Sequence, residues 1–488
     1  MSTAQLEQQQ LLIGGEWTEA SSGSTFERAD PFTGEPAGTA AAAKRDDARS
    51  AADAAAEAFG DWSTSPPSQR RELLQKAAAL LTERAEDIAA TVTRETGGTF
   101  GWGMFNCKLA ADMLGEAAAQ TTAVRGELIP SDVPGLLAMG VRQPAGVVVG
   151  IAPWNAPVIL GTRAVASPLA YGNTVVLKAS EICPRTHAEI CRALDDAGLP
   201  PGVINVITHE PDDAPDVVDE LIAHPAVRRV NFTGSTRVGR LVAENAARHL
   251  KRVLLELGGK APMVLLADAD LDEAVAAAKF GAFLHQGQIC MSTERVVADR
   301  SVSADFAARL SEKARALKVG DPREPDTEIG PLVNPSAVER VAGLVEDAVS
   351  HGAEILCGGE ADGPLFPPTV LAGVTSEMRV YAEESFGPVV GIIDVDGPED
   401  AVRVANDTEY GLSAAVFGSH VPTALGVARR IESGICHVNG STVHDEAQMP
   451  FGGVKASGWG RFGGTAALEE FTELRWMTVQ HGSRPYPL

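Results

Sequence analysis

The sequence contains little positive charge. Its 488 residues include 41 Lys and Arg against 65 Asp and Glu, which gives a formal net charge of −24. Nucleic acids and anionic membranes bind proteins through clustered positive charge, so we expect neither as a partner. Apolar residues make up 44% of the chain, which is ordinary for a globular protein. A chain of this length is too long for one hydrophobic core, and we therefore expect two or three domains.

The sequence also lacks the cysteine patterns of a zinc site or of a disulfide framework. Six cysteines are scattered without a CxxC pair, and they are Cys107, Cys183, Cys191, Cys290, Cys357 and Cys436. The N-terminal stretch "MSTAQLEQQQLLIGGEW" has no basic region before its short apolar run, so no secretory signal is predicted. These absences predict no bound metal and a reducing, cytoplasmic location.

One stretch is long and uncharged enough to raise the question of a membrane span. It runs from Gln143 to Thr162, but prolines at positions 144, 153 and 157 interrupt it. A buried strand followed by a loop fits this pattern better than a membrane helix does.

Helical and strand patterns divide the chain. The first quarter predicts helices over residues 46–62, 68–98 and 106–121. From Gly146 to Gly259, short β-branched runs alternate with amphipathic helices, and this predicts a parallel sheet covered on both faces. A second alternating series follows, with helices near 271–285, 304–317 and 335–351 and strands near 388–395 and 414–417. We therefore predict an α/β protein with two parallel-sheet domains, whose ligands bind beyond the carboxyl ends of the strands.

The usual dinucleotide fingerprint GxGxxG is missing where it would be expected. The run "TGSTRVG", Thr233 to Gly239, instead follows a predicted strand and begins a helix. The free N–H groups and positive dipole end of such a helix suit a pyrophosphate. An ordinary helix cap without a ligand fits the run equally well.

Other polar residues stand where predicted strands end. Lys178 and Glu181 lie in "LKASE", where a carboxylate could bind both ribose hydroxyls and repel a 2′-phosphate, favouring NAD over NADP. Asn155, between two prolines, could donate to an oxyanion. Glu256, after an apolar strand, should have a raised pKa that suits a general base. Each residue alone also fits a structural role, as a surface ion pair, a turn residue or a buried ion pair.

Cys290 lies in "HQGQICMSTER" and is either a nucleophile in a tight turn or a small buried residue. Burial alone is the commoner fate of a free cysteine. The neighbouring motifs favour the first interpretation, because only this cysteine follows a candidate base, Glu256, by 34 positions in company with a candidate oxyanion donor.

Taken together, the motifs resemble those of the NAD(P)-dependent aldehyde dehydrogenases over nearly the whole chain. The matching stretches are "PWNAP", "LKASE", "FTGSTRVG", "LELGGKAP", "QGQIC", "EESFGPVV" and "PFGGVKASGWGR". The resemblance implies two Rossmann-like domains and a small β segment for oligomerisation. The implied ranges are 1–121 and 142–254 for NAD binding, 255–447 for catalysis, and 122–141 and 466–488 for oligomerisation, as a homodimer or homotetramer.

The resemblance also implies residue roles. Cys290 would attack the aldehyde, Asn155 would hold the oxyanion, Glu256 would activate water, and Lys178 would serve the active site and the cofactor. The implied cofactor residues are Ile151, Ala152, Pro153, Trp154, Lys178, Ser180, Glu181, Phe232, Gly234, Ser235, Val238, Glu256, Leu257, Gly258, Glu384 and Phe386. Because Glu256 is present, hydrolysis to the free acid is expected rather than transfer to coenzyme A.

The stretches around Asn155 and Cys290 are similar to those of the branch that acts on vanillin, salicylaldehyde and benzaldehyde. An aromatic aldehyde is therefore the expected substrate, with Arg163, Ile289 and Met291 as candidate contacts. Arg163 would meet a ring hydroxyl or carboxylate, or it would form a salt bridge at a domain or subunit contact. The alternatives are a semialdehyde or betaine-aldehyde dehydrogenase, a non-catalytic protein with the same fold, and a cofactor-free cysteine hydrolase.

Overall fold

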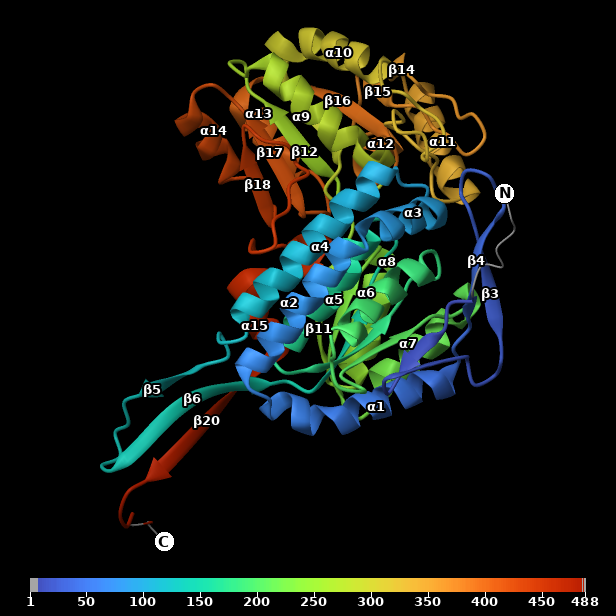
Figure 1. The fold of residues 1–488 in the computed structure, drawn as a ribbon. Helices are drawn as coiled ribbons and strands as arrows, with labels where there is room; N and C mark the ends of the chain where they lie inside the picture. The colour runs from blue at the N-terminus through green and yellow to red at the C-terminus, as the bar shows by residue number, and fades with distance from the viewer. Residues whose placement is uncertain (1–7, 485, 487–488) are drawn as a thin grey trace.

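Two large β-sheets, each covered by helices, make up most of the molecule, and a three-stranded arm projects from it (Figure 1). The structure is a computed structural model that describes residues 8–484 and 486. Among these residues, no helix combines the length and the apolar character needed to cross a bilayer.

The first sheet has eight strands. Their order is β19 (Gly458–Trp459), β11 (Arg252–Glu256), β10 (Val227–Thr233), β7 (Val147–Ile151), β8 (Thr174–Lys178), β9 (Ile204–Ile207), β1 (Leu11–Ile13) and β2 (Glu16–Thr18). The five central strands are parallel, and β7 and β8 are buried along their whole length, as the apolar runs predict. The predicted parallel sheet is confirmed, and three edge strands outside the predicted series, β1, β2 and β19, add to it in antiparallel pairing. These strands of two or three residues are too short to show a pattern in the sequence.

Helices cover this sheet on both faces. They are α1 (Arg45–Thr64), α2 (Pro67–Glu83), α3 (Ala85–Thr96), α4 (Phe100–Gln120), α5 (Pro157–Ala170), α6 (Pro184–Asp196), α7 (Ala214–Ala223) and α8 (Thr236–Arg248), with the short η1 (Pro211–Asp213) before α7. The predicted helix over 68–98 is wrong as a single helix. It breaks at Arg84, where the chain turns so that both α2 and α3 pack against α4. The predicted stop at Gly97 is confirmed by its left-handed conformation.

The second sheet has seven strands, and all but β14 are parallel. Their order is β14 (Glu354–Cys357), β15 (Thr369–Ala372), β16 (Val389–Val395), β13 (Thr293–Asp299), β12 (Ala261–Leu265), β17 (Ser413–Phe417) and β18 (Ile435–Val438). The accompanying helices are α9 (Leu271–Phe283), η2 (Leu284–Gly287), α10 (Arg300–Arg315), α11 (Pro335–Ser350), α12 (Arg379–Ala382), α13 (Gly397–Asn406) and α14 (Val421–Ala428). The predicted second α/β series is therefore present, with a helix–strand order close to the expected one.

The remaining strands form two antiparallel units. The arm consists of β5 (Gly126–Ile129), β6 (Leu136–Pro144) and β20 (Thr472–Gln480), and it extends away from both large sheets (Figure 1). A hairpin of β3 (Thr25–Ala29) and β4 (Pro36–Ala41) lies near the N-terminus, and the C-terminal region adds η3 (Lys455–Ser457), η4 (Gly464–Ala466) and α15 (Ala467–Phe471). The arm thus joins two segments that are more than 300 positions apart in the sequence.

Candidate active site

The carboxyl edge of the first sheet gathers the predicted cofactor residues. Strands β8, β7, β10 and β11 are neighbours and parallel, so the chain leaves all four at the same edge. The register places Ile151 beside both Lys178 and Phe232. The predicted residues in or just beyond these four strand ends are Ile151, Ala152, Pro153, Trp154, Lys178, Ser180, Glu181, Phe232, Gly234, Ser235, Val238, Glu256, Leu257 and Gly258. Four motifs that are distant in the sequence therefore form one crevice edge.

The N-terminus of α8 has the features that the run "TGSTRVG" predicts. Ser235 is the N-cap residue, and its Oγ accepts a hydrogen bond from the Val238 N–H at 3.4 Å. A Cβ on Gly234 would lie 2.5 Å from the Phe232 ring, and one on Gly239 would lie 2.4 Å from Leu257. Glycine is thus required at both positions for this close approach of helix to sheet. The N-terminus of this 13-residue helix also has free backbone N–H groups, which suit a pyrophosphate.

Lys178 and Glu181 lie together beyond β8, with 3.9 Å between Nζ and Oε2. Burial lowers the pKa of Lys178, against the opposing charge of Glu181. A residue that the sequence analysis did not single out supports this loop. His187 accepts the Ser180 N–H at 3.0 Å through Nδ1, and burial lowers its pKa to about 3, so it remains neutral. His187 thereby fixes a loop whose Glu181 carboxylate is half-buried, as ribose recognition would require.

The second sheet contributes the loop of Glu384 and Phe386, which lies between α12 and β16. The Glu384 carboxylate accepts the Gly259 N–H at 2.8 Å, and burial raises the pKa of Glu384 to about 8. Phe386 has a left-handed backbone, with φ +45°, and its ring stands edge-on to Trp154 at 5.7 Å between centroids. Glu384 and Phe386, the residues predicted to hold the nicotinamide ribose, therefore lie against the carboxyl edge of the first sheet although they come from the second.

Glu294 on β13 holds this loop in place and was not predicted. Its buried carboxylate accepts the N–H groups of Ser385 at 2.8 Å and Phe386 at 3.0 Å, and it pairs with the buried Lys260 ammonium at 2.5 Å. No local pattern in "STER" distinguishes this glutamate from an exposed one, because its partners come from other parts of the chain. Glu294 thus positions Glu384 and Phe386 without belonging to any predicted motif.

The turn that carries Cys290 has an unusual backbone. His285, Gln286 and Gly287 are consecutive left-handed residues, with φ of +50°, +57° and +68°. Such a conformation is costly for residues with a Cβ and persists only where surrounding contacts enforce it. Here the Gln286 amide donates to the carbonyls of Gly97 and Pro331 at 3.1 and 2.9 Å.

Further contacts fix the same turn. Gln288 accepts the Val333 N–H at 3.1 Å, and the His285 ring stacks on Trp102 at 4.8 Å. Trp102 in turn donates its indole N–H to the Asn155 carbonyl at 3.1 Å. The predicted tight turn is therefore present, and it is held by the Trp102 side chain of α4 and by backbone groups of the loop before α11.

Cys290, Asn155 and Glu256 come together at this turn. The Asn155 amide donates to the Gln288 carbonyl at 2.9 Å, which places it against the cysteine loop. Glu256 is fully buried, and neither carboxylate oxygen has a hydrogen-bond partner among the described residues. Burial raises the pKa of Glu256 to about 7, in the direction expected from the sequence and in the range that suits a general base near neutral pH. Burial, reinforced by the Glu256 charge, raises the pKa of the Cys290 thiol, so the thiol is protonated until a base takes its proton.

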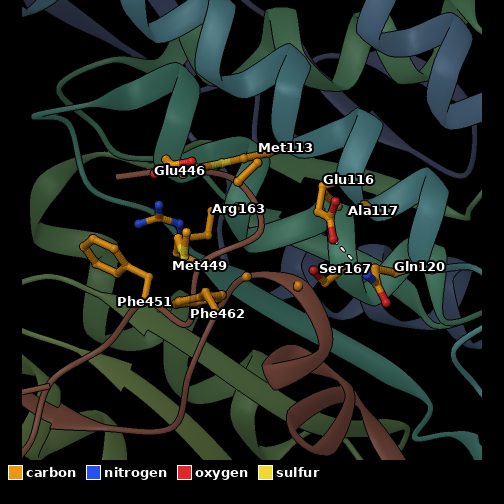
Figure 2. A pocket seen from close by; sticks show the side chains of 14 residues that line it. Met113, Glu116, Ala117, Gln120, Arg163, Ser167, Glu446, Met449, Phe451 and Phe462 are labelled. Atoms are coloured by element: carbon orange, nitrogen blue, oxygen red, sulfur yellow. Dashed lines mark hydrogen bonds between the residues drawn. The ribbon is translucent and has the colours of Figure 1, made fainter. Parts of the chain in front are cut away.

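The three candidate substrate residues lie close to this site. Ile289 and Met291 flank Cys290 and are buried in the same apolar cluster as Phe451. Arg163 on α5 is also buried, and its guanidinium lies 4.1 Å from the Phe451 ring centroid (Figure 2). Arg163 forms a salt bridge with Asp445, a residue of the loop after β18 that the sequence analysis did not identify.

Known proteins match this chain over nearly its whole length. The model of the aldehyde dehydrogenase family matches residues 17–477. Vanillin dehydrogenase of Pseudomonas fluorescens is 56% identical over 478 residues, covering 98% of this chain and 99% of that protein. Salicylaldehyde dehydrogenase of Pseudomonas putida is 47% identical, with 98% and 99% covered.

A solved structure agrees with these relatives. The crystal structure of a salicylaldehyde dehydrogenase from Pseudomonas putida G7, complexed with salicylaldehyde, superposes with a TM-score of 0.97 at 47% identity, covering 99% of this chain and all of that one. The resemblance inferred from the motifs is therefore confirmed, and the chain belongs to the aldehyde dehydrogenase family.

Proposed function

We propose that this protein oxidises an aromatic aldehyde to the carboxylic acid with NAD as hydride acceptor. The observation that carries the proposal is the buried, unpartnered Glu256 carboxylate beside the protonated thiol of Cys290, with the Asn155 amide against the same loop. A thiol and a base in such contact can form and then hydrolyse an acyl enzyme. The similarity to dehydrogenases of vanillin and salicylaldehyde supports the aromatic class.

The reaction follows from these three side chains. The Cys290 thiol gives its proton to Glu256, which passes it to water, and the sulfur attacks the carbonyl carbon. The Asn155 amide with the Cys290 N–H stabilises the oxyanion of the thiohemiacetal. One such donor typically contributes about 3–4 kcal/mol to lowering the barrier. A bound NAD would supply hydride acceptance, and loss of a hydride from the thiohemiacetal carbon leaves a thioester on Cys290. Glu256 then takes a proton from water, which attacks the thioester carbon, releases the carboxylic acid and returns the proton to the sulfur.

The crevice edge fits a dinucleotide. The α8 N-terminus with Ser235 would hold the pyrophosphate, and Glu384 with Phe386 would hold the nicotinamide ribose. Glu181 would bind the adenosine ribose, and its carboxylate would repel the additional phosphate of NADP. NADP therefore remains the weaker alternative cofactor.

We also propose a homo-oligomer assembled through the arm. Strand β20 presents Leu474, Trp476 and Val479 with 60%, 77% and 43% of their surfaces exposed. The second sheet ends at β18, so its edge can accept another strand. A strand of the arm that pairs with β18 of a second copy would bury both surfaces, in a dimer or a tetramer.

Because all six cysteines are free thiols, a reducing cytoplasm remains the expected location.

A panel of aldehydes tests the proposal. Purified protein would be mixed with NAD or NADP and with benzaldehyde, salicylaldehyde, vanillin, hexanal, succinic semialdehyde or betaine aldehyde, and formation of reduced cofactor would be followed by absorbance. We expect the highest kcat/KM with an aromatic aldehyde and NAD. A clear preference for an aliphatic semialdehyde or for betaine aldehyde would contradict the aromatic assignment, while no reduction with any aldehyde would contradict the activity itself.

A further inference from the structure

A fully buried ion pair joins the chain segments that follow Glu256 and Cys290. Nζ of Lys260 lies 2.5 Å from Oε2 of Glu294, and the side chains are 0% and 4% exposed. Buried charges are costly to desolvate, and replacing such a pair by apolar side chains of similar volume is often neutral for stability. No step of the proposed mechanism uses either group. Stability and chemistry therefore leave the presence of this pair unexplained.

The backbone of β13 is irregular at Glu294. Thr293 pairs with Ala261 on β12, and the next pair joins Arg295 to Pro262, so Glu294 is an extra residue in this ladder. Such a β-bulge redirects a side chain, and bulges are common beside active sites. The bulge thus turns the Glu294 carboxylate out of the ladder and toward the loop between α12 and β16, which it contacts.

The Glu294 carboxylate fixes the backbone of residues 384–386, which we call the ribose loop. Its oxygens accept the N–H groups of Ser385 at 2.8 Å and Phe386 at 3.0 Å. Arg340 of α11 also donates to the Ser385 carbonyl. These bonds hold Phe386 at φ +45°, a backbone that a residue with a Cβ adopts only where its surroundings enforce it. The pair therefore determines where the candidate nicotinamide-ribose side chains stand.

The same pair ties the ribose loop to the nucleophile and to the base. Glu294 follows Cys290 by four positions. Lys260 follows Glu256 by the same interval. The two segments are in close contact, because a Cβ on Gly259 would lie 2.4 Å from the Cys290 carbonyl oxygen. The Gly259 N–H also donates to the ribose loop at 2.8 Å. Segments that carry the nucleophile, the base and the nicotinamide-ribose residues therefore meet at one buried ion pair.

We propose that the Lys260–Glu294 pair positions the nicotinamide for hydride transfer, by holding the ribose loop at a fixed distance from Cys290. This inference rests on the proposed dehydrogenase function and adds two positioning residues to it. Reacting atoms must be aligned at about 3–3.5 Å, and a displacement of about 1 Å can slow a step by about 100-fold. The adenosine half of the cofactor would bind at Lys178 and Glu181 on the first sheet, independently of this pair.

Two double variants separate the hydrogen bonds from the buried charges. The acceptor-keeping variant combines Lys260→Met with Glu294→Gln, which removes both charges but leaves an amide oxygen for the loop N–H groups. The acceptor-free variant combines Lys260→Met with Glu294→Met, side chains of similar volume that keep the packing. The two variants therefore differ only in the acceptor that Ser385 and Phe386 require.

Binding of the two cofactor halves is measured separately. NADH is titrated by fluorescence, and ADP, which lacks the nicotinamide half, is titrated by calorimetry. We expect the acceptor-free variant to bind NADH about tenfold more weakly than the acceptor-keeping variant does, with their ADP affinities within about twofold of each other. Equal NADH affinities in the two variants, or an equal loss for NADH and ADP, would overturn the inference.

The hydride step is measured as the first-turnover burst of reduced cofactor with an aromatic aldehyde. We expect the burst of the acceptor-free variant to be about 100-fold slower than that of the acceptor-keeping variant, and slower still with an aldehyde deuterated at the formyl carbon. Alkylation of Cys290 by iodoacetamide should proceed at rates within about twofold in the two variants. A matching fall in the alkylation rate would show that the pair supports the cysteine turn instead, and would overturn the inference.

The variant Asp299→Asn is the matched control. Asp299 ends the same strand, and its carboxylate also accepts two backbone N–H groups, from Ser301 at 3.0 Å and Gly397 at 3.2 Å. These contacts lie at the far end of β13 from Glu294. The control should keep the NADH affinity, the ADP affinity and the burst rate of the wild type. A loss of NADH affinity as large as that of the acceptor-free variant would overturn the inference.

The variant Glu294→Asp covers the case in which the double variants do not fold. It keeps the charge and the acceptor but shortens the side chain by one carbon–carbon bond, about 1.5 Å. We expect the burst rate to fall by about tenfold or more, with the ADP affinity unchanged. A wild-type burst rate in Glu294→Asp would overturn the inference. If the wild type oxidised no aldehyde, the proposed function would fail, and the contrast between NADH and ADP would still decide whether the pair positions the ribose loop.

Discussion

The carboxyl edge of the first sheet and the turn that carries Cys290 are built in different ways. At the edge, four parallel strands place their residues by ordinary register, as Ile151 beside Lys178 and Phe232 illustrates. At the turn, three consecutive left-handed residues are held by contacts to distant parts of the chain. The binding side therefore uses regular structure, whereas the nucleophile is presented by a strained backbone that long-range contacts enforce.

Removal of the nucleophile should have the largest effect. The variant Cys290→Ser replaces the attacking sulfur by a hydroxyl of much higher pKa, and we expect kcat to fall by about four orders of magnitude or more. This fall in kcat is measured from the formation of reduced cofactor with the best aromatic aldehyde. Cys436→Ser is the control, because Cys436 is also half-buried but lies on β18, and its activity should stay near wild type. Full activity in Cys290→Ser would refute the proposed mechanism.

Loss of the base should affect hydrolysis more than acylation. In Glu256→Gln, we expect the steady-state rate to fall by about 10²–10⁴, with a smaller fall in the rate of the first-turnover burst of reduced cofactor, for which water must then accept the Cys290 proton. Because burial raises the pKa of Glu256 to about 7, its basic form grows as pH rises through that value. The wild-type rate should therefore increase from about pH 6 to about pH 8, and this rise should vanish in the variant. A variant that keeps the same pH profile would exclude Glu256 as the base.

Two glycine substitutions compare the strained turn with the strand edge. In Gly287→Ala, the new Cβ would lie 2.1 Å from the Gly387 carbonyl oxygen on a backbone with φ +68°. Neither atom can move easily, and we expect the free energy of unfolding to fall by about 2–4 kcal/mol, together with activity. In Gly258→Ala, the Cβ would lie 2.6 Å from the carboxylate at the end of the Glu384 side chain. That carboxylate can swing away, so stability should change by less than about 1 kcal/mol while NADH binding weakens by about tenfold.

Urea unfolding and fluorescence titration with NADH would measure these two effects. Gly343→Ala on α11 is the control for added methyl groups, because a Cβ there meets no neighbouring atom within 4 Å. It should leave NADH binding unchanged and stabilise the helix slightly. If Gly287→Ala and Gly258→Ala gave the same pattern, the contrast between turn and edge would be wrong.

The same contrast explains what the sequence could predict. The strand-ending motifs around Asn155, Lys178, Ser235 and Glu256 follow apolar runs, so local pattern was enough to locate one shared edge. The antiparallel edge strands β1, β2 and β19 lacked any such pattern, because their pairing depends on segments far away in the chain. The break at Arg84 likewise reflects packing of two helices on α4 rather than a helix-breaking residue.

Within the site, the residues that escaped prediction are those that act through distant partners. Glu294 looks like a surface residue in "STER" until Ser385, Phe386 and Lys260 surround it. Asp445 gains its meaning only beside Arg163. The left-handed backbone of the turn before Cys290 was equally hidden, since Gln286 carries no intrinsic preference for that conformation. Sequence therefore located the groups that react or bind, and three-dimensional packing was needed to find those that position them.

The smallest effect concerns the choice between NAD and NADP at the first sheet's edge. Glu181 is half-buried, and its pKa is lowered because Lys178 and other nearby cations outweigh burial, so it is ionised at neutral pH. In Glu181→Gln the ribose hydroxyls keep an acceptor, but the repulsion of a 2′-phosphate disappears. We expect the ratio of kcat/KM for NAD to that for NADP to fall by about tenfold, mostly through a lower KM for NADP. Glu189→Gln on α6 should leave the ratio unchanged, and an unaltered ratio in Glu181→Gln would show that the strand edge does not select the cofactor through this carboxylate.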